Sequence, residues 1–302
     1  MRRLLCATDF SPASGPAWAF AQRLALATKA ELFLLHVLPP VSPEGPFDAP
    51  THGRSRQEEM RQTLAALGRL VEFMIDESLR VSVQVEEGSA APRILARCER
   101  EGADLLVVGT HGRTGLDRLL LGSVAGEVVD LAPCPVVTVR PLPAVPRAGG
   151  HGLRRLVYPT DVSCWPPRAW PWVKALAEAT GTEVDVLHGL AEVPPAAGAG
   201  PVSAAPPSEA RREAARSHLE RFVATCGLPG DRVHLHLVRS VDAEQIVHWA
   251  RARQADLIAM ESLGRPEAGQ PTLGRAARGV LSTAPCPVLT VGPRVTAAAR
   301  GA

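Results

Sequence analysis

The sequence lacks the features that mark several large classes of protein. Its 302 residues contain 6 cysteines, scattered singly without a CxxC pair, so no disulfide framework is expected. The apolar run near the N-terminus is too short for a signal peptide, and no stretch approaches the length of a membrane span. A net charge of +2 gives no reason to invoke nucleic acid or a membrane. We therefore expect a soluble, cytoplasmic protein with buried, reduced thiols.

Catalytic signatures are missing as well. The sequence contains no GxSxG nucleophile elbow, no HExxH zinc motif and no pair of carboxylates near a base. It also lacks the GxxxxGK[ST] phosphate loop, the GxGxxG dinucleotide motif and the SGGxDS-type loop of ATP pyrophosphatases. An enzyme with rapid turnover needs a positioned base or a metal cluster, and the sequence nominates neither.

What the sequence does contain is one long internal repeat. Residues 6–11 (CATDFS) recur at 158–163 (YPTDVS), and residues 132–139 (APCPVVTV) recur at 284–291 (APCPVLTV). Both pairs are separated by 152 residues. A constant offset from end to end indicates two copies of one domain with almost no insertions between them.

Within the first copy, apolar strand patterns alternate with helical patterns. The expected strands cover residues 3–8, 32–37, 81–85, 105–108 and 135–140, and a long helix is expected over 56–78. Ser11 and Pro12 are expected to begin the first helix. The alternation predicts an α/β fold of two tandem, doubly wound, Rossmann-like domains, each a five-stranded parallel sheet with helices on both faces.

The domain boundaries follow from the same pattern. We expect a first domain over 1–140, a Pro/Gly-rich linker over 141–153, a second domain over 154–293 and a disordered tail over 294–302. A low-complexity insert over 191–207 is expected to be mobile. In the second copy Pro171 stands where the first copy has Ala19, so the helix there should start late or kink.

The first copy also has a glycine-rich loop between a buried strand and a helix. The apolar run 105–108 ends at Gly109, Gly112 follows, and Gly122 and Ser123 come directly before a new helical pattern. Glycines allow close approach of the backbone, and the free N–H groups of a helix N-terminus favour phosphate. Glycines between a strand and a helix are also common in α/β proteins that bind no phosphate, so a purely structural loop stays open.

This pattern, G-x2-G-x9-G-S after a buried strand and followed by a helix and CPVVTV, resembles the ATP-binding signature of the universal stress protein family. The resemblance covers both halves, from Arg3 to Pro293. It implies strand order 3-2-1-4-5, and hence a ligand crevice between the first and fourth strands. Carried over residue by residue, it implies that ATP is contacted by Asp9, Val37, Val108, Gly109, Gly112, Gly122, Ser123 and Val124.

The individual residues leave alternatives open. Val37 offers an apolar wall to a purine, and Asp9 can accept a hydrogen bond from the nucleoside or can cap a helix beside Ser11. His111 and Arg113 either reach the phosphates or are solvated loop side chains. Mg²⁺ is expected to accompany the triphosphate, held mostly by phosphate oxygens and water.

The resemblance therefore implies an ATP-binding universal stress protein that uses the nucleotide as a regulatory or sensory signal in the stress response. Slow ATP hydrolysis or autophosphorylation is the most chemistry that it implies. The alternative is an interaction scaffold that binds no nucleotide and has a structural glycine loop. The family usually joins fifth-strand edges across a two-fold axis, and the short linker allows the same pairing within one chain. A further homodimer is possible.

The two copies are expected to be unequal. At the constant offset Gly109 becomes Glu261, Ser123 becomes Arg275 and Val37 becomes Gly189, whereas Gly112 and Gly122 become Gly264 and Gly274. The glutamate places a negative charge where a polyphosphate should approach. We expect only the first copy to bind ATP, and we expect Arg275 to form an ion pair with Glu261 across the second cradle.

Two side-chain groups remain. His234 and His236 alternate along an expected strand, so they share a face, but two histidines without a third ligand make a metal site improbable. Trp165, Trp170 and Trp172 cluster near the first helix of the second copy. They are expected to pack in the core or at the domain contact, with a partner surface as the alternative.

Overall fold

A computed structural model describes most of the chain. The described residues are 1–11, 14–40, 56–74, 78–110, 121–141, 152–160, 168–190, 209–262 and 273–295. Gly112, Arg113, His111, Gly264 and Trp165 lie outside them, as do the low-complexity insert and most of the predicted linker and tail.

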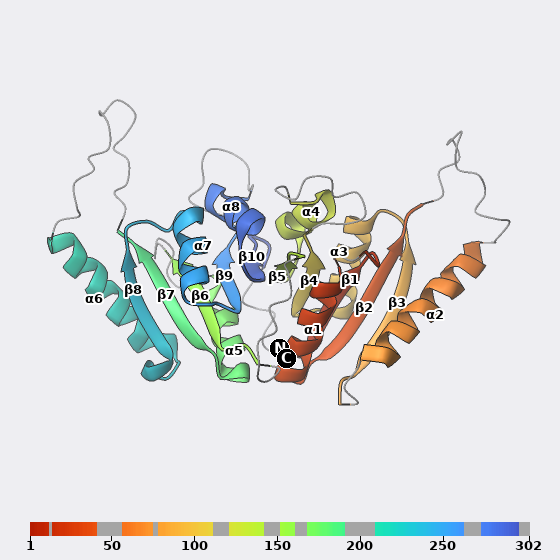
Figure 1. Cartoon of the computed structure of the whole chain (residues 1–302), viewed down its shortest axis with the longest axis horizontal. Coiled ribbons are helices and arrows are strands. Elements are labelled where there is room, and N and C mark those ends of the chain that lie inside the picture. The colour runs from red at the N-terminus through yellow and green to blue at the C-terminus, as the bar shows by residue number, and fades with distance from the viewer. Residues whose placement is uncertain are drawn as a thin grey trace, which may run out of the picture.

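Strands and helices alternate through both halves (Figure 1). The elements of the first half are β1 (Arg3–Thr8), α1 (Gly15–Thr28), β2 (Glu31–Leu38), α2 (Arg56–Met74), β3 (Val81–Glu87), α3 (Ala90–Glu101), β4 (Leu105–Gly109), α4 (Ser123–Leu131) and β5 (Val136–Val139). Those of the second half are β6 (Arg155–Thr160), α5 (Trp170–Thr180), β7 (Glu183–Gly189), α6 (Glu209–Cys226), a short 3-10 helix (Gly230–Arg232), β8 (Val233–Val238), α7 (Ala243–Ala252), β9 (Leu257–Glu261), α8 (Arg275–Thr283) and β10 (Val288–Val291).

The strands form one sheet of ten, in the order β3-β2-β1-β4-β5-β10-β9-β6-β7-β8. Each half therefore has the predicted order 3-2-1-4-5, and its strands pair in parallel. Only β5 and β10 pair antiparallel among the described strands. This confirms the α/β fold with two tandem, doubly wound units.

Two apolar layers cover the two faces of the sheet, and each layer runs through both halves. One contains buried side chains of α1, α2, α5 and α6, and the other contains those of α3, α4, α7 and α8. Because both faces are covered, a central strand such as β4 is a continuous apolar run: Leu105, Leu106 and Val107 are fully buried. Among the described helices, none combines the length and apolar character needed to cross a bilayer.

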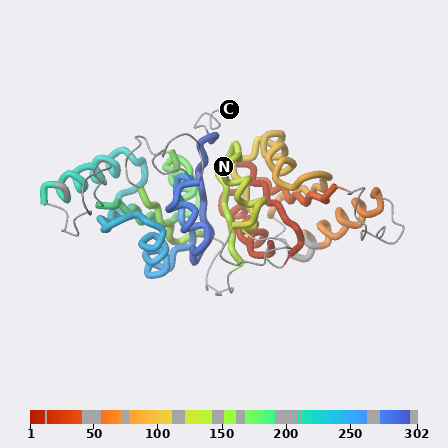
Figure 2. The backbone as a smooth tube through the Cα atoms, turned by 90° about the horizontal axis from the view of Figure 1, so that it is seen from above, coloured from red at the N-terminus to blue at the C-terminus, as the bar shows by residue number. Residues whose placement is uncertain are grey.

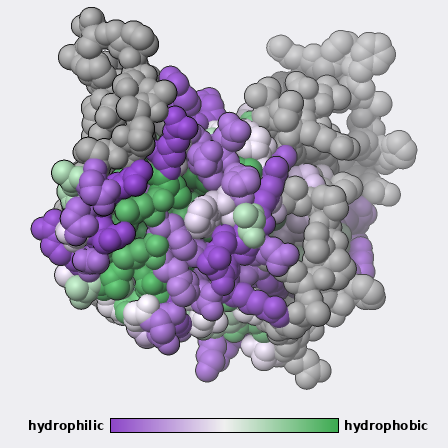
Figure 3. Space-filling model, turned by 60° about the vertical axis from the view of Figure 1, so that its left-hand side comes forward, coloured by the Kyte–Doolittle hydropathy of each residue, from purple (hydrophilic) through white to green (hydrophobic). Residues whose placement is uncertain are grey.

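The two outer strands, β3 and β8, are the edges of the sheet. Figure 3 brings the β8 end forward and shows an apolar band flanked by hydrophilic surface. Partly buried Val223 of α6 and Leu235 and Leu237 of β8 pack against the α1/α5 layer at this end. The inner face of the edge strand is thus only partly covered by its helix.

The first helix begins later than predicted. α1 starts at Gly15 with Ser14 as its N-cap residue, so the expectation that Ser11 caps a helix beginning at Pro12 is wrong. The physical reason is a local turn. The Asp9 carboxylate accepts hydrogen bonds from both the backbone N–H and the hydroxyl of Ser11, which holds this residue outside the helix.

The second-copy helix does start late, as Pro171 predicts. α5 begins at Trp170, whereas the residue equivalent to Gly15 is Pro167. Trp170 and Trp172 are both buried, and the Trp170 indole Nε1 donates to the carbonyl oxygen of Cys226 at 3.0 Å. Core packing, the expected role, is confirmed for these two tryptophans.

The two halves meet along β5 and β10, which lie at the centre of the molecule (Figure 2). Val137 lies opposite Leu289 in this pairing, and both side chains are fully buried. The hydroxyl of Thr138 donates to the carbonyl oxygen of Val288 at 3.4 Å, and that of Thr290 donates to Val136 at 3.2 Å. The two halves therefore share one continuous sheet through the antiparallel pairing of β5 with β10.

We predict that Leu289→Ala lowers the free energy of unfolding by roughly 2–5 kcal/mol, because it leaves a cavity where the halves join. Urea unfolding followed by circular dichroism measures the change. Leu64→Ala on α2 is the matched control, since Leu64 is 46% exposed and its loss should change stability by less than about 0.5 kcal/mol. Equal effects of the two substitutions would contradict the prediction.

Candidate functional site

The candidate site lies where the strand order of the first half reverses. β1 pairs with β2 on one side and with β4 on the other, and all three strands run in parallel. The helices that follow β1 and β4 lie on opposite faces, and in open α/β sheets ligands bind beyond the carboxyl ends of the strands at such a switch point. Asp9 directly follows β1, and Gly109 is the last residue of β4.

The turn after β1 holds Asp9 in a defined position. Its Oδ1 accepts hydrogen bonds from the Ser11 backbone N–H at 3.0 Å and from the Ser11 hydroxyl at 2.7 Å. Burial acts to raise the pKa of this carboxyl, but hydrogen bonds from Ser11 and Ser14 outweigh it and hold the pKa below its ordinary value. Asp9 is thus an ionised hydrogen-bond acceptor at neutral pH, and it closes a turn rather than capping α1.

The turn also contains Phe10, which the sequence analysis did not identify. Phe10 has a φ of 61°, in the left-handed region that non-glycine residues rarely adopt. Its ring packs on His36 of β2 with the centroids 4.6 Å apart, and it remains 36% exposed. His36 is buried, and its Nδ1 lies 2.7 Å from the carbonyl oxygen of Thr8. The sequence carried one signal for the role of His36, because this histidine recurs as His188 at the constant offset. The His188 Nδ1 likewise lies 3.2 Å from the carbonyl oxygen of Thr160.

The N-terminus of α4 lies next to the end of β4. The backbone N–H of Gly122 donates to the carbonyl oxygen of Thr110 at 2.8 Å, which fixes the start of the helix against the end of β4. Ser123 and Val124, the first two helical residues, are both exposed. No side chain in the described part of the chain caps α4. The first N–H groups of a helix have no intrahelical partner, so those at the start of α4 are available to an acceptor outside the helix.

The predicted contact residues fall into two groups. Asp9, Val37 and Gly109 lie at the carboxyl ends of β1, β2 and β4, and Gly122 to Val124 lie at the start of α4, so the structure brings these together. Val108 is only 4% exposed, which leaves its backbone as the part able to meet a ligand. Gly112 and Arg113, outside the described residues, stay predictions.

The second half repeats the backbone of the cradle. Gly274 donates to the Ser262 carbonyl oxygen at 2.8 Å, and its φ and ψ of −60° and 155° match the −59° and 152° of Gly122. Its side chains differ. Glu261 ends β9, and its carboxylate accepts a hydrogen bond from the backbone N–H of Arg168 at 2.7 Å. The expected ion pair between Glu261 and Arg275 stays a prediction.

The second half also differs where Val37 stands in the first. A Cβ added at Gly189 would lie 3.1 Å from the backbone nitrogen of Val241 and 3.2 Å from its Cγ2. The segment between β8 and α7 thus approaches the end of β7 too closely for an unshifted valine. The backbone of this segment therefore takes part of the space that a valine side chain at this position would need.

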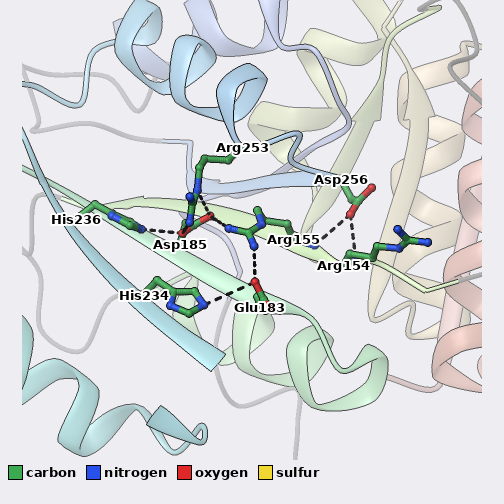
Figure 4. Close-up of polar contacts among 8 residues, drawn as sticks. All are labelled: Arg154, Arg155, Glu183, Asp185, His234, His236, Arg253 and Asp256. Atoms are coloured by element: carbon green, nitrogen blue, oxygen red, sulfur yellow. Dashed lines mark hydrogen bonds and ion pairs between the residues drawn. The ribbon is translucent and has the colours of Figure 1, made fainter. Parts of the chain in front are cut away.

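A buried charged network distinguishes the second half further (Figure 4). Asp185 of β7, in the position of Phe33, has a side chain with no exposed surface. Its carboxylate lies 3.1 Å from Nη1 of Arg155, 3.2 Å from Nη2 of Arg253 and 2.7 Å from Nε2 of His236. Burial acts to raise the pKa of this carboxyl, but hydrogen bonds from Arg253 and His236 and the two guanidinium charges lower it.

The neighbours extend this network to the edge of the sheet. Glu183 pairs with Arg155, and its carboxylate lies 3.6 Å from Nε2 of His234. The His236 ring packs on Trp249 of α7 at a centroid distance of 4.7 Å. Each of the two histidines therefore faces a carboxylate of β7. The described residues contain no group of three or more side chains arranged to hold a metal ion.

Comparison with known proteins gives one consistent result. The model of the universal stress protein family matches residues 1–140 and again residues 152–292. A universal stress protein of Mycolicibacterium smegmatis is 28% identical over 300 residues, which cover 96% of this chain and 97% of that protein. A universal stress protein of Methanocaldococcus jannaschii is 33% identical over 140 residues, which cover 46% of this chain and 82% of that protein.

Solved structures agree on the fold. A protein of Pseudomonas aeruginosa, described as functionally unknown, has a TM-score of 0.66 at 20% identity, covering 97% of this chain and 93% of that one. A universal stress protein solved in complex with cAMP covers 47% of this chain and 98% of its own at a TM-score of 0.35 and 22% identity. A TM-score this low carries no argument about this chain, so the cAMP complex is a finding about that protein alone.

We predict that Asp185→Asn lowers the free energy of unfolding by roughly 2–3 kcal/mol. The substitution removes the charge partner of Arg253 and one of the two charge partners of Arg155, which also pairs with Glu183. The cost is reduced because both guanidinium groups reach solvent. Urea unfolding measures the change in the free energy of unfolding. Glu183→Gln is the matched control: this carboxylate is 44% exposed and should contribute less than about 1 kcal/mol. A larger loss for Glu183→Gln would show that the buried carboxylate is not the centre of the network.

The same network predicts a pH dependence of stability. The Asp185 pKa is lower in the folded protein than in the unfolded chain, so its contribution is complete at neutral pH. It should begin to fall below about pH 5 and disappear once the pH drops through the folded pKa. The difference in stability between the wild type and Asp185→Asn should therefore shrink between pH 7 and pH 3. A difference that grows on acidification would contradict this.

Proposed function

Since the chain belongs to the universal stress protein family, we propose that its first domain, residues 1–140, binds ATP as a regulatory signal in the cytoplasm. The observation that carries the proposal is the switch point between β1 and β4, where two parallel strands end at the same edge of the sheet. An ionised carboxylate (Asp9) lies on one side of it, and a helix N-terminus without a side-chain cap (Gly122 and Ser123) lies on the other.

The chemistry of these groups fits the two ends of a nucleotide. Asp9 accepts hydrogen bonds and suits the amine or hydroxyl groups of adenosine, with Val37 as the apolar wall for the purine. The N–H groups at the start of α4 suit a polyphosphate, and the exposed Ser123 adds a hydroxyl donor. Phe10, exposed at the rim and packed on His36, keeps the Asp9 turn in place.

A magnesium ion would accompany the triphosphate. Because the described residues offer no group of side chains for a metal, the ion would be held mostly by phosphate oxygens and water. The site offers no positioned base in the described chain either, so at most slow hydrolysis or autophosphorylation is expected.

The second domain, residues 154–293, would bind no ATP. Glu261 places a carboxylate at the end of β9, where the first domain has Gly109. Two like charges ~4 Å apart at an effective dielectric near 20 repel by about 4 kcal/mol, roughly a thousandfold in affinity. The close approach of Val241 to Gly189 removes the purine wall as well.

The antiparallel β5–β10 pairing supports an intrachain counterpart of a two-fold dimer. The two threonine bonds across it, from Thr138 and from Thr290, are equivalent under the offset of 152 residues, as a pseudo-two-fold axis requires. Association of whole chains into a homodimer would use other surfaces, because this edge is already paired.

Titration calorimetry should give one ATP per chain, and Gly109→Glu should reduce affinity by roughly a thousandfold through charge repulsion. The substitution should leave the fold intact, since the equivalent end of β9 carries Glu261 in the same backbone. Thr110→Ser is the matched control: it copies Ser262, keeps the hydroxyl and should leave affinity unchanged.

A stoichiometry of two would show that the second domain binds nucleotide. No saturable binding at millimolar ATP would leave the alternative of a scaffold with a structural glycine loop. Loss of binding in Thr110→Ser as well would point to a general disturbance of β4 rather than to charge.

A further inference from the structure

A second cavity, which we call the junction cavity, lies at the opposite ends of the strands from the proposed ATP site. It has a volume of about 530 Å³, which is within the range of small-molecule sites in proteins. Met1 lines it, so the N-terminus in Figure 1 marks its place, beside α5. Residues of both halves contribute to the lining, including Arg3 and Asp104 of the first half and Trp172, Ala175 and Val295 of the second.

Arg3 supplies a cation to the junction cavity. Its Nη1 donates to the carbonyl oxygen of Glu101 at 2.7 Å, which uses one of the five N–H groups of a guanidinium. In the described part of the chain, the Arg3 guanidinium forms no ion pair with a carboxylate. The bond to Glu101 therefore orients the guanidinium and leaves N–H groups for an anionic ligand.

The equivalent arginine of the second half is used differently. Arg155 follows Arg3 at the constant offset, and it pairs with Glu183 and with Asp185. The first half has Phe33 at the position of Asp185, so this buried carboxylate is missing there. Arg155 is thus a structural cation of the sheet, whereas Arg3 is available to an external anion.

The carboxylate in the lining is already engaged by the backbone. The Asp104 Oδ2 accepts hydrogen bonds from the N–H groups of Arg2 at 2.5 Å and of Arg3 at 3.1 Å. Both arginines line the junction cavity, and among the described residues that line it Asp104 is the only acidic one. The wall of the cavity therefore carries a net positive charge.

The rest of the lining is mainly apolar. Trp172 of α5, Pro133 and Pro135 contribute rings, and Val295 contributes a branched side chain. Trp172 is 6% exposed, so the surrounding chain holds its indole in place. Aromatic rings pair favourably with an indole. A cation beside apolar rings fits a ligand that has one anionic group on an aromatic body.

We propose that the junction cavity binds a small aromatic carboxylate. The guanidinium of Arg3 pairs with the carboxylate through charge-assisted hydrogen bonds, and the aromatic body packs against Trp172. Because the lining comes from both halves, the bound ligand stabilises the junction between them. This site is separate from the nucleotide site and does not depend on it.

We expect one such site per chain. At the constant offset, Ala175 corresponds to Arg23 of α1, and Trp172 corresponds to Phe20. The Arg23 Nη2 lies 3.5 Å from the carbonyl oxygen of Gly152. A long, charged side chain therefore stands at the position where the junction cavity has only a methyl group.

Titration calorimetry of the full-length protein with 2-naphthoate tests the proposal. The wild type should bind one molecule per chain, and 2-naphthamide, which has the same rings without the charge, should bind roughly tenfold or more weakly because the charge-assisted pair is lost. Arg3→Gln should weaken the binding of 2-naphthoate by a similar factor. Arg80→Gln is the matched control and should bind like the wild type, since Arg80 is exposed directly before β3 and does not line the cavity.

The location of the site is tested separately. Ala175→Leu places a larger side chain in the cavity without a change of charge, so it should weaken binding at least as much as Arg3→Gln. Saturating ATP should leave the affinity for 2-naphthoate unchanged, and circular dichroism checks that each variant is folded. No saturable binding at millimolar 2-naphthoate, equal affinity for 2-naphthamide, competition by ATP, or an unchanged affinity in Arg3→Gln or Ala175→Leu would each overturn the proposal.

Discussion

The antiparallel pairing of β5 with β10 is the contact on which the architecture depends. Each half alone would end in a short, entirely apolar strand, Val136–Val139 or Val288–Val291, with an unpaired edge. Pairing satisfies both edges at once and merges two five-stranded sheets into one of ten. It also makes the two apolar layers continuous across the junction.

Much of this fold follows from the sequence because it depends on local patterns. The constant offset reveals the duplication, and apolar runs such as residues 105–108 reveal strands that are covered on both faces. The start of α1 was predicted wrongly because Ser11 followed by Pro12 looks like a helix start, yet the hydrogen bonds from Ser11 to Asp9 stabilise a competing turn. Side chains that can bond to nearby backbone often decide such boundaries.

The site was also predictable only in part, because some of its features are local in sequence and others depend on contacts between distant residues. Glycines and a serine at fixed spacing mark the start of α4, but Phe10 gives no signal in sequence because its role depends on a left-handed backbone and on His36 in the next strand. Asp185 gives none either: it is a single acidic residue in the apolar run VDVLH. Its partners Arg155, His236 and Arg253 are 30, 51 and 68 residues away, and only the folded sheet brings them together.

The two halves show that one backbone can carry two different sets of side chains. Gly122 and Gly274 have nearly the same dihedral angles and donate to equivalent carbonyl groups at the same distance. The backbone geometry at this helix N-terminus is therefore a product of the fold that both halves share. The halves differ in several side chains at equivalent positions: glycine or glutamate at the end of the fourth strand, serine or arginine at the start of the helix, and phenylalanine or aspartate in the second strand. A buried aspartate needs charged partners where phenylalanine needs none, so the second half has exchanged part of its apolar layer for a charged network. The ligand chemistry of each half must accordingly be argued from these side chains, because the shared backbone is equally compatible with a binding site and with none.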